Sequence, residues 1–321
     1  MAAGNSRPVV IAAFAGNTLV AITKFLTAWW TGSSAMLSEA IHSLVDTSNQ
    51  VLLLYGLRRA EQPPDASHPL GYGREIYFWS FIVALLMFMI GAGVTFYEGI
   101  QHIRNPHEIV DARISYIVLA CAAIFEGVSW VIALREFSKS KGNLGYYSAM
   151  RQSKDPPTFI VLFEDSAALI GLFIAFLGTL ASDQLGMPVL DGVASIGISI
   201  VLAGTALVLA RESKGLLMGE SASPQTRDAI LAIAQELDGI ERAQIIFTVH
   251  LAPDQVIVAL RLEFRDDLTA SDIEKTTAEL ERRIHDAHHE VIAIFVKPQP
   301  VSRQASEAGR LVQPNGLAKP A

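Results

Sequence analysis

Four polar side chains inside one apolar stretch have the spacing of one helix face, and two of them are of types that bind a divalent cation. Glu39, His42, Asp46 and Asn49 lie in SEAIHSLVDTSNQ, three or four residues apart, so they share one face of a helix. An ionisable side chain near the middle of a bilayer costs about 2.5 to 3.5 kcal/mol on insertion scales, so such a face is expected to turn toward a pore or an ion. His42 and Asp46 are one turn apart and could ligate the same cation. The alternative is a polar seam that joins two helices by hydrogen bonds.

The composition of the chain indicates a membrane protein. Of its 321 residues, 51% are hydrophobic and 18% are charged, and the mean hydropathy is +0.35, whereas a soluble chain averages about 25% charged residues. The apolar residues are concentrated before Arg211. The net charge of −7 gives no indication of a nucleic-acid partner. A single cysteine, Cys121, excludes an internal disulfide and a multi-cysteine metal site. No cleavable signal peptide is expected, because the first apolar segment is too long for one.

Six apolar segments are long enough to cross a hydrocarbon core, which needs about 20 helical residues at ~1.5 Å per residue. These segments are residues 9–30, 35–57, 76–103, 114–137, 158–181 and 189–210. Lys and Arg are concentrated after the second, fourth and sixth segments, so the positive-inside rule predicts that both termini are cytoplasmic. Lys24 lies within the first segment, where it either snorkels or pairs with a carboxylate of the bundle.

A soluble domain follows the apolar segments. Periodicity predicts a helix over 226–237, strands over 243–251 and 256–264, a helix over 270–287 and a strand over 291–296. The order αββαβ favours an open-faced, ferredoxin-like α+β sandwich, and its uncovered face and edge suit a dimerisation module. We therefore expect the following five parts: a tail over 1–8, a six-helix transmembrane domain over 9–214, a linker over 215–222, a cytoplasmic α+β domain over 223–300 and a disordered tail over 301–321.

The order and spacing of several motifs resemble the cation diffusion facilitator family. The motifs are SEAIHSLVDT, HPLGYGREIYFWSF, LFEDSAALIG, DGVASIGI and RESKGLLMGE, and the similarity runs from about residue 10 to residue 298. The adjacent Glu and Asp in LFEDSAALIG are most similar to the zinc transporter 9-like branch. The resemblance implies a homodimer that exports a divalent cation from the cytoplasm in exchange for protons. Zn²⁺ is the expected cargo, with Mn²⁺, Fe²⁺, Co²⁺ and Cd²⁺ as alternatives, and the expected membrane is the inner membrane of a bacterium.

The resemblance also implies that the cation binds between the second and fifth segments, on His42, Asp46 and Asp165. The family places a further His or Asp one turn before Asp165, but this chain has Val161 there. One protein ligand is therefore missing, and another group or water has to complete the coordination shell.

Three more carboxylates are candidates for the site. Glu164 is favoured for the missing ligand, although it points about 100° away from Asp165 around a helix. Glu126 in the fourth segment is the second candidate, and it could instead pair with Lys24. Glu39 could gate the mouth of the site or form a hydrogen bond to a neighbouring helix.

Other candidate ligands are assigned structural roles. Asp191 is expected to cap the sixth helix, His68 to belong to a tight turn, and His102 and His107 to be solvated.

No regulatory metal is expected in the soluble domain. Family members with a cytoplasmic metal site place histidines near the end of the last strand, where this chain has Phe295 and Lys297.

Two function classes remain open at the level of sequence. One is a proton-coupled metal transporter, because protons compete with the cation for imidazole and carboxylate groups. The other is a membrane-embedded metal sensor or scaffold with little flux. An enzyme is not expected, because HExxH, GxSxG and a nucleophile paired with a base are absent from the sequence. Beyond the lipid bilayer, the expected partners are the transported ion, protons and a second copy of the chain, with no cofactor.

Overall fold

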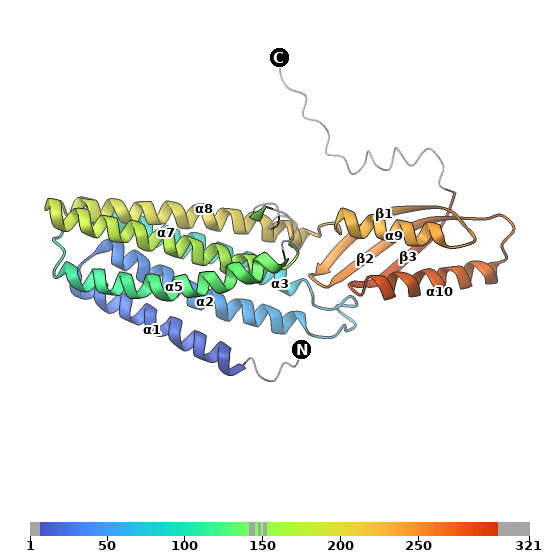
Figure 1. Cartoon of the computed structure of the whole chain (residues 1–321), viewed down its shortest axis with the longest axis horizontal. Coiled ribbons are helices and arrows are strands. Elements are labelled where there is room, and N and C mark those ends of the chain that lie inside the picture. The colour runs from blue at the N-terminus through green and yellow to red at the C-terminus, as the bar shows by residue number, and fades with distance from the viewer. Residues whose placement is uncertain (1–6, 141–144, 147–148, 150–152, 301–321) are drawn as a thin grey trace, which may run out of the picture. The chain divides into compact units, whose positions relative to one another are not determined.

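The computed structural model describes residues 7–140, 145–146, 149 and 153–300, which form two compact units (Figure 1). The first unit is Met1–Met218 and the second is Gly219–Ala321. The expected tail over 301–321 and most of the tail over 1–8 lie outside the described residues.

The first unit is built from long helices that contain the six expected segments, and the last of these helices continues to Met218, into the expected linker over 215–222. They are α1 (Arg7–Thr31), α2 (Ser34–Ala60), α3 (Glu75–Leu86) continued by the π-helix η1 (Met87–Ala92) and α4 (Gly93–Arg104), α5 (Ala112–Ser140), α7 (Pro156–Leu185) and α8 (Val189–Met218). Among the described residues, four spans are long and apolar enough to cross a membrane: Glu75–Arg104, Ala112–Arg135, Phe159–Leu185 and Val189–Met218. Helices α1 and α2, with 25 and 27 residues, are long enough as well, and α2 carries the polar stripe within its length.

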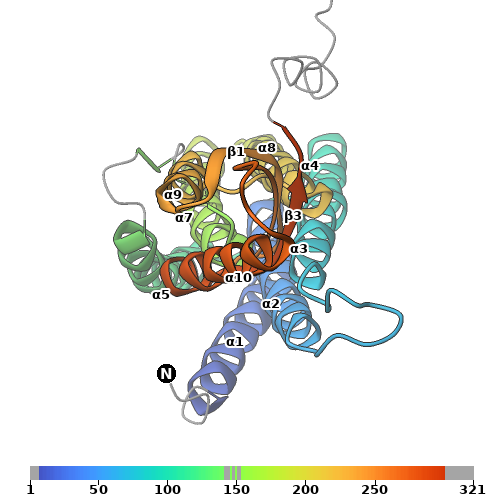
Figure 2. The same cartoon turned by 90° about the vertical axis from the view of Figure 1, so that its right-hand side faces the viewer.

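The helices of the first unit pack around α2, α7 and α8. Helix α8 contacts α7, α4 and α3, whereas α2 contacts α1, α3, α7 and α8, and α5 contacts α7 and α1. Figure 2 shows α1 beside α2 and α4 beside α8. The close approach of α4 and α8 depends on two glycines, because a Cβ on Gly99 would lie 3.0 Å from the Gly192 carbonyl oxygen and a Cβ on Gly192 would lie 3.0 Å from that of Gly99. Small residues of this kind let membrane helices approach backbone to backbone.

The second unit has the predicted αββαβ order. It consists of α9 (Pro224–Glu236), β1 (Ile240–Ala252), β2 (Gln255–Phe264), α10 (Ala270–Ala287) and β3 (Val291–Pro298). The sheet order is β1-β2-β3, with β1 and β2 antiparallel and β2 and β3 parallel. Alternate residues of β2 are buried with apolar residues of both helices in one core, which includes Val256, Val258, Leu260, Ile230, Ala234, Leu280 and Ile284. The two helices therefore cover one face of the sheet.

The glycine contact between α4 and α8 predicts an unequal response to two alanine substitutions in α8. Gly192→Ala should destabilise the first unit by about 1 to 3 kcal/mol, because the new methyl group would lie 3.0 Å from the backbone oxygen of Gly99 and 2.9 Å from Cγ1 of Ile103. Gly204→Ala should be neutral or stabilising, because a Cβ there meets no atom within 4 Å and alanine favours the helix. Thermal unfolding of the two purified variants in detergent measures the difference, and equal midpoints would contradict this account of the packing.

Candidate metal-transport site

The polar stripe of α2 faces the interior of the bundle. Glu39 and Asn49 are fully buried, His42 is 1% exposed, and the side chain of Asp46 is 15% exposed. The Nε2 atom of His42 lies 3.4 Å from Oδ2 of Asp46. Neither ring nitrogen of His42 makes a hydrogen bond to a described residue, and Oδ1 of Asp46 makes none either. Two groups suited to metal binding are therefore adjacent, and three of their polar atoms make no hydrogen bond to a described residue.

Carboxylates from three helices surround a small cavity next to this pair. Asp46 of α2, Glu126 of α5, and Glu164 and Asp165 of α7 all line it. The remaining lining residues are Asn17, Val20, Ser43, Gln50, Ser129 and Val161. The space for the centre of a water-sized group is about 20 Å³, which fits one small ion or a water molecule.

The two carboxylates of α7 are oriented by hydrogen bonds from other helices. Asn49 donates from Nδ2 to Oε1 of Glu164 at 2.8 Å, and Ser129 donates from Oγ to Oδ2 of Asp165 at 2.8 Å. The bond from Asn49 draws Glu164 toward α2, so both acids of the Glu-Asp pair line the cavity despite their different directions around the helix. Such partners fix the orientation of ligating groups in metal sites.

The candidate ligands do not yet form a closed coordination shell. Within residues 7–140 and 153–300, no three His, Cys, Asp or Glu side chains have an arrangement that could hold a metal ion. Asp46, Glu164 and Asp165 share the cavity, and His42 lies beside Asp46 rather than among the lining residues. Val161 also lines the cavity and supplies no donor.

Glu39 is engaged in a buried ion pair. Nζ of Lys24, which is 0% exposed, lies 3.3 Å from Oε2 of Glu39 and 3.9 Å from Oε1 of Glu126. The ammonium also donates to Oγ of Ser43 at 2.7 Å. Of the two alternatives expected for Lys24, the structure shows pairing with a bundle carboxylate. The other oxygen of Glu39 lies against Gly171 of α7, where a Cβ would collide with it.

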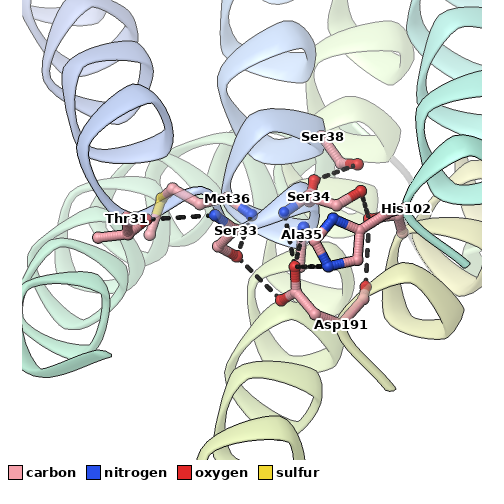
Figure 3. Close-up of polar contacts among 9 residues, drawn as sticks. Thr31, Ser33, Ser34, Ala35, Met36, Ser38, His102 and Asp191 are labelled. Carbon is pink, nitrogen blue, oxygen red and sulfur yellow. Dashed lines mark hydrogen bonds and ion pairs between the residues drawn. The ribbon is translucent and has the colours of Figure 1, made fainter. Parts of the chain in front are cut away.

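Asp191 caps a helix, but the helix is α2 rather than its own helix α8 (Figure 3). Its carboxylate accepts hydrogen bonds from the backbone nitrogens of Ser34 and Ala35, at 2.5 and 3.1 Å, and from Oγ of Ser33 at 2.9 Å. The first N–H groups of α2 have no partner within the helix, and a carboxylate satisfies them well. The prediction that Asp191 caps the sixth helix is therefore wrong, because the helix that it caps is α2.

The expectation that His102 is solvated is also wrong. This residue is 5% exposed, and its Nε2 atom lies 4.0 Å from Oδ2 of Asp191 (Figure 3). The cause is the close packing of α4 against α8, which brings His102 to the buried carboxylate. His107 is exposed, as expected.

The loop after α2 gives His68 a structural role. Its Nδ1 atom lies 3.6 Å from Oδ1 of Asp65, and the Asp65 carboxylate accepts hydrogen bonds from the Tyr72 hydroxyl, the His68 backbone and Ser67. These bonds, with that from Tyr72 the strongest, hold the pKa of Asp65 below its usual range. The turn is therefore organised around an aspartate anion.

The histidines of the second unit have separate surroundings. His250 is buried, with Nδ1 3.2 Å from the carbonyl oxygen of Ala252. His288 lies 3.1 Å from Oε1 of Glu290, and the rings of His285 and His289 are 5.9 Å apart between centroids. The expectation that this domain has no regulatory metal stays a prediction.

Sequence reasoning missed Ser129, which orients Asp165. A signal for it exists, because Ser129 follows Glu126 by three residues and so lies on the same face of α5. Both residues line the cavity.

Comparison with known proteins identifies the family to which this chain belongs. Residues 10–218 match the cation efflux transmembrane domain, so the chain belongs to the cation efflux family and is a membrane protein. This result confirms the resemblance to cation diffusion facilitators.

Three of the relatives of this chain have names that refer to metal transport or metal tolerance. The human proton-coupled zinc antiporter SLC30A9, a mitochondrial protein, is 36% identical over 220 residues, which are 68% of this chain and 39% of the human protein. Metal tolerance protein C4 of Arabidopsis thaliana is 28% identical over 276 residues, or 85% of this chain and 60% of the plant protein. The cation-efflux pump FieF of Shigella boydii is 25% identical over 280 residues, or 85% of this chain and 86% of the pump. The chain thus spans less than two thirds of the human and plant relatives.

Proposed function

We propose that this protein exports Zn²⁺ from the cytoplasm in exchange for protons. The observation that carries the proposal is the cavity where carboxylates of α2 and α7 meet beside His42. The names of the relatives support the proposal, since they include a proton-coupled zinc antiporter, a metal tolerance protein and a cation-efflux pump. An orientation with both termini in the cytoplasm and a location in a bacterial inner membrane are part of the same proposal.

Four side chains form the proposed coordination set. Zn²⁺ prefers four ligands from imidazole nitrogen and carboxylate oxygen when thiolates are absent. Asp46, Glu164 and Asp165 already line the cavity, and His42 lies within 3.4 Å of Asp46. Asp46 already lines the cavity, so rotation of the His42 side chain would complete the set. Neither ring nitrogen of His42 nor Oδ1 of Asp46 would lose a hydrogen bond to a described residue by turning to the cation. Glu164 then supplies the donor that Val161 lacks.

Exchange with protons follows from the charge of the same groups. Several carboxylates around one small cavity repel one another strongly in a low-dielectric bundle. A bound dication relieves the repulsion, and so do protons on the carboxylates. Since ligands must give up protons to bind a metal, the two occupants exclude each other. Alternating exposure of the cavity to the two sides of the membrane then couples metal export to proton entry.

Removal of either α2 ligand tests the site. We expect His42→Ala and Asp46→Ala each to lower Zn²⁺ flux by at least about tenfold, because each removes a donor to the cation. The measurement is Zn²⁺ transport in proteoliposomes with an imposed pH gradient, and Ser48→Ala, an exposed position of the same helix, is the control. Wild-type flux in both variants would contradict the site. Tight Zn²⁺ binding by the wild-type protein without flux would instead favour a sensor or scaffold.

The identity of the fourth ligand is tested by two amide substitutions. Glu164→Gln should weaken Zn²⁺ binding about tenfold or more and alter the pH dependence of flux, because the amide keeps the shape but loses the charge and the titrating proton. Glu126→Gln should have the smaller effect, because Glu126 already lies 3.9 Å from the Lys24 ammonium. The checks are isothermal titration of each variant and flux measured from pH 6 to pH 8, a range of about one unit on each side of neutrality. Normal binding and flux in both variants would indicate that water completes the shell.

The homodimer belongs to the proposal, with the open face of the sheet as its contact. Phe247, Ala259 and Phe295 are aligned across the three strands, on the face opposite to the helix-covered residues Val258 and Leu260. The two phenylalanines remain 50% and 56% exposed. An apolar row across a sheet face is suited to burial against a second copy of the chain.

A charge placed on the open face should weaken the dimer. Phe295→Glu is expected to raise the dimer dissociation constant by about tenfold or more, because a carboxylate would be buried in an apolar contact. Ala278→Glu introduces the same charge at an exposed position of α10 and is the matched control. Light scattering of the full-length proteins over a concentration series measures the change. An unchanged dimer in Phe295→Glu would move the interface elsewhere.

A further inference from the structure

Lys24 is a fixed positive charge at the edge of the proposed metal site. Among the described residues it is the only lysine or arginine that is buried, with 0% exposure. Its ammonium is satisfied by Oε2 of Glu39 at 3.3 Å and Oγ of Ser43 at 2.7 Å, with Glu126 at 3.9 Å. Ser43 and Glu126 both line the cavity, so the ammonium acts on the same space that would hold the cation.

The pairing divides the acidic groups in and next to the cavity into two sets. Glu39 and Glu126 share the ammonium of Lys24. Asp46, Glu164 and Asp165 have no described lysine or arginine within ion-pair distance (4.0 Å), and their described partners are His42, Asn49 and Ser129. A buried carboxylate that leaves its ammonium for a metal would strand a buried charge, which is costly. The first set is thereby withheld from the cation, although Glu126 is close enough to reach it.

We propose that Lys24 determines metal specificity by keeping Glu39 and Glu126 out of the coordination shell. The proposal rests on the proposed function and adds a residue to it. With Lys24 in place, the donors are one imidazole and three carboxylates, a small mixed set that suits Zn²⁺. Without it, Glu126 becomes a further oxygen donor, and Glu39 can follow. Additional hard oxygen donors and a larger coordination number favour Mn²⁺ relative to Zn²⁺.

A purely structural role for Lys24 leads to a different result. If the ion pair only joined α1 to α2, its loss would lower the stability of the bundle and leave the preference among metals unchanged. The ratio of Mn²⁺ to Zn²⁺ transport is therefore the informative quantity, since it is independent of how much protein folds.

The experiment compares four proteins in proteoliposomes loaded with Mn²⁺ or Zn²⁺ under the same pH gradient. Lys24→Met/Glu39→Gln removes the ion pair as a neutral unit, which protects folding, and frees Glu126. Its Mn²⁺-to-Zn²⁺ rate ratio should rise at least about fivefold over that of the wild type, since specificity is a difference of affinities. Lys24→Arg keeps the charge and should keep the ratio of the wild type. Addition of Glu126→Gln to the double variant should restore that ratio.

Two results would overturn the proposal. One is an unchanged ratio in the double variant when its melting temperature shows that it is folded. The other is a raised ratio that persists after Glu126→Gln is added, because Glu126 would then not be the group that Lys24 restrains. If the wild type transports neither metal, the proposed function fails on its own, and the ratio of Mn²⁺ to Zn²⁺ dissociation constants from calorimetry then decides the role of Lys24 by the same criteria.

Discussion

The burial of charge along α2 is the constraint on which the membrane unit depends. A charged group removed from water is costly unless another group compensates it. Glu39 pairs with Lys24 of α1, Asn49 binds Glu164 of α7, and His42 lies against Asp46 within α2 itself. The same polar stripe that the proposed transport requires therefore joins α2 to the helices on both sides, so the site and the architecture depend on one set of contacts.

The position of the stripe along the bundle is set at the start of α2. Asp191 of α8 accepts hydrogen bonds from the first N–H groups of that helix, groups that would otherwise lie unsatisfied in a buried setting. Since the rise per residue is fixed at ~1.5 Å, the depth of His42 and Asp46 relative to α8 follows from this cap. The π-helical segment η1, between α3 and α4, is a local change of helical winding in a neighbouring part of the bundle. It contacts α8 and α2.

Local patterns predicted much of this structure, and non-local contacts account for what they missed. The spacing of Glu39, His42 and Asp46 was sufficient to predict a buried stripe, and alternation predicted the αββαβ order. The position of the Glu164 carboxylate was harder to predict. The angle of Glu164 around α7 takes no account of the length of its side chain or of the hydrogen bond from Asn49. The environments of Asp191 and His102 depend on partners far away in the sequence, 157 residues apart in the case of Ser34 and Asp191, and periodicity within one helix contains no information about them.

The partners of the acids also distinguish a fixed half of the site from a movable half. Glu164 and Asp165 are each held by a hydrogen bond from another helix, at 2.8 Å in both cases. Oδ1 of Asp46 and both nitrogens of His42 have no such bond to a described residue. Reorientation is less costly for groups that lose no hydrogen bond. In the proposed cycle α7 therefore supplies the preset ligands, and α2 completes the shell by moving His42 and Asp46. The contacts of α2 with α1 and α7 run along the same face of α2 as His42 and Asp46. Because these two ligands rotate when the cation binds, α2 is the helix whose surroundings differ between the occupied and the empty cavity.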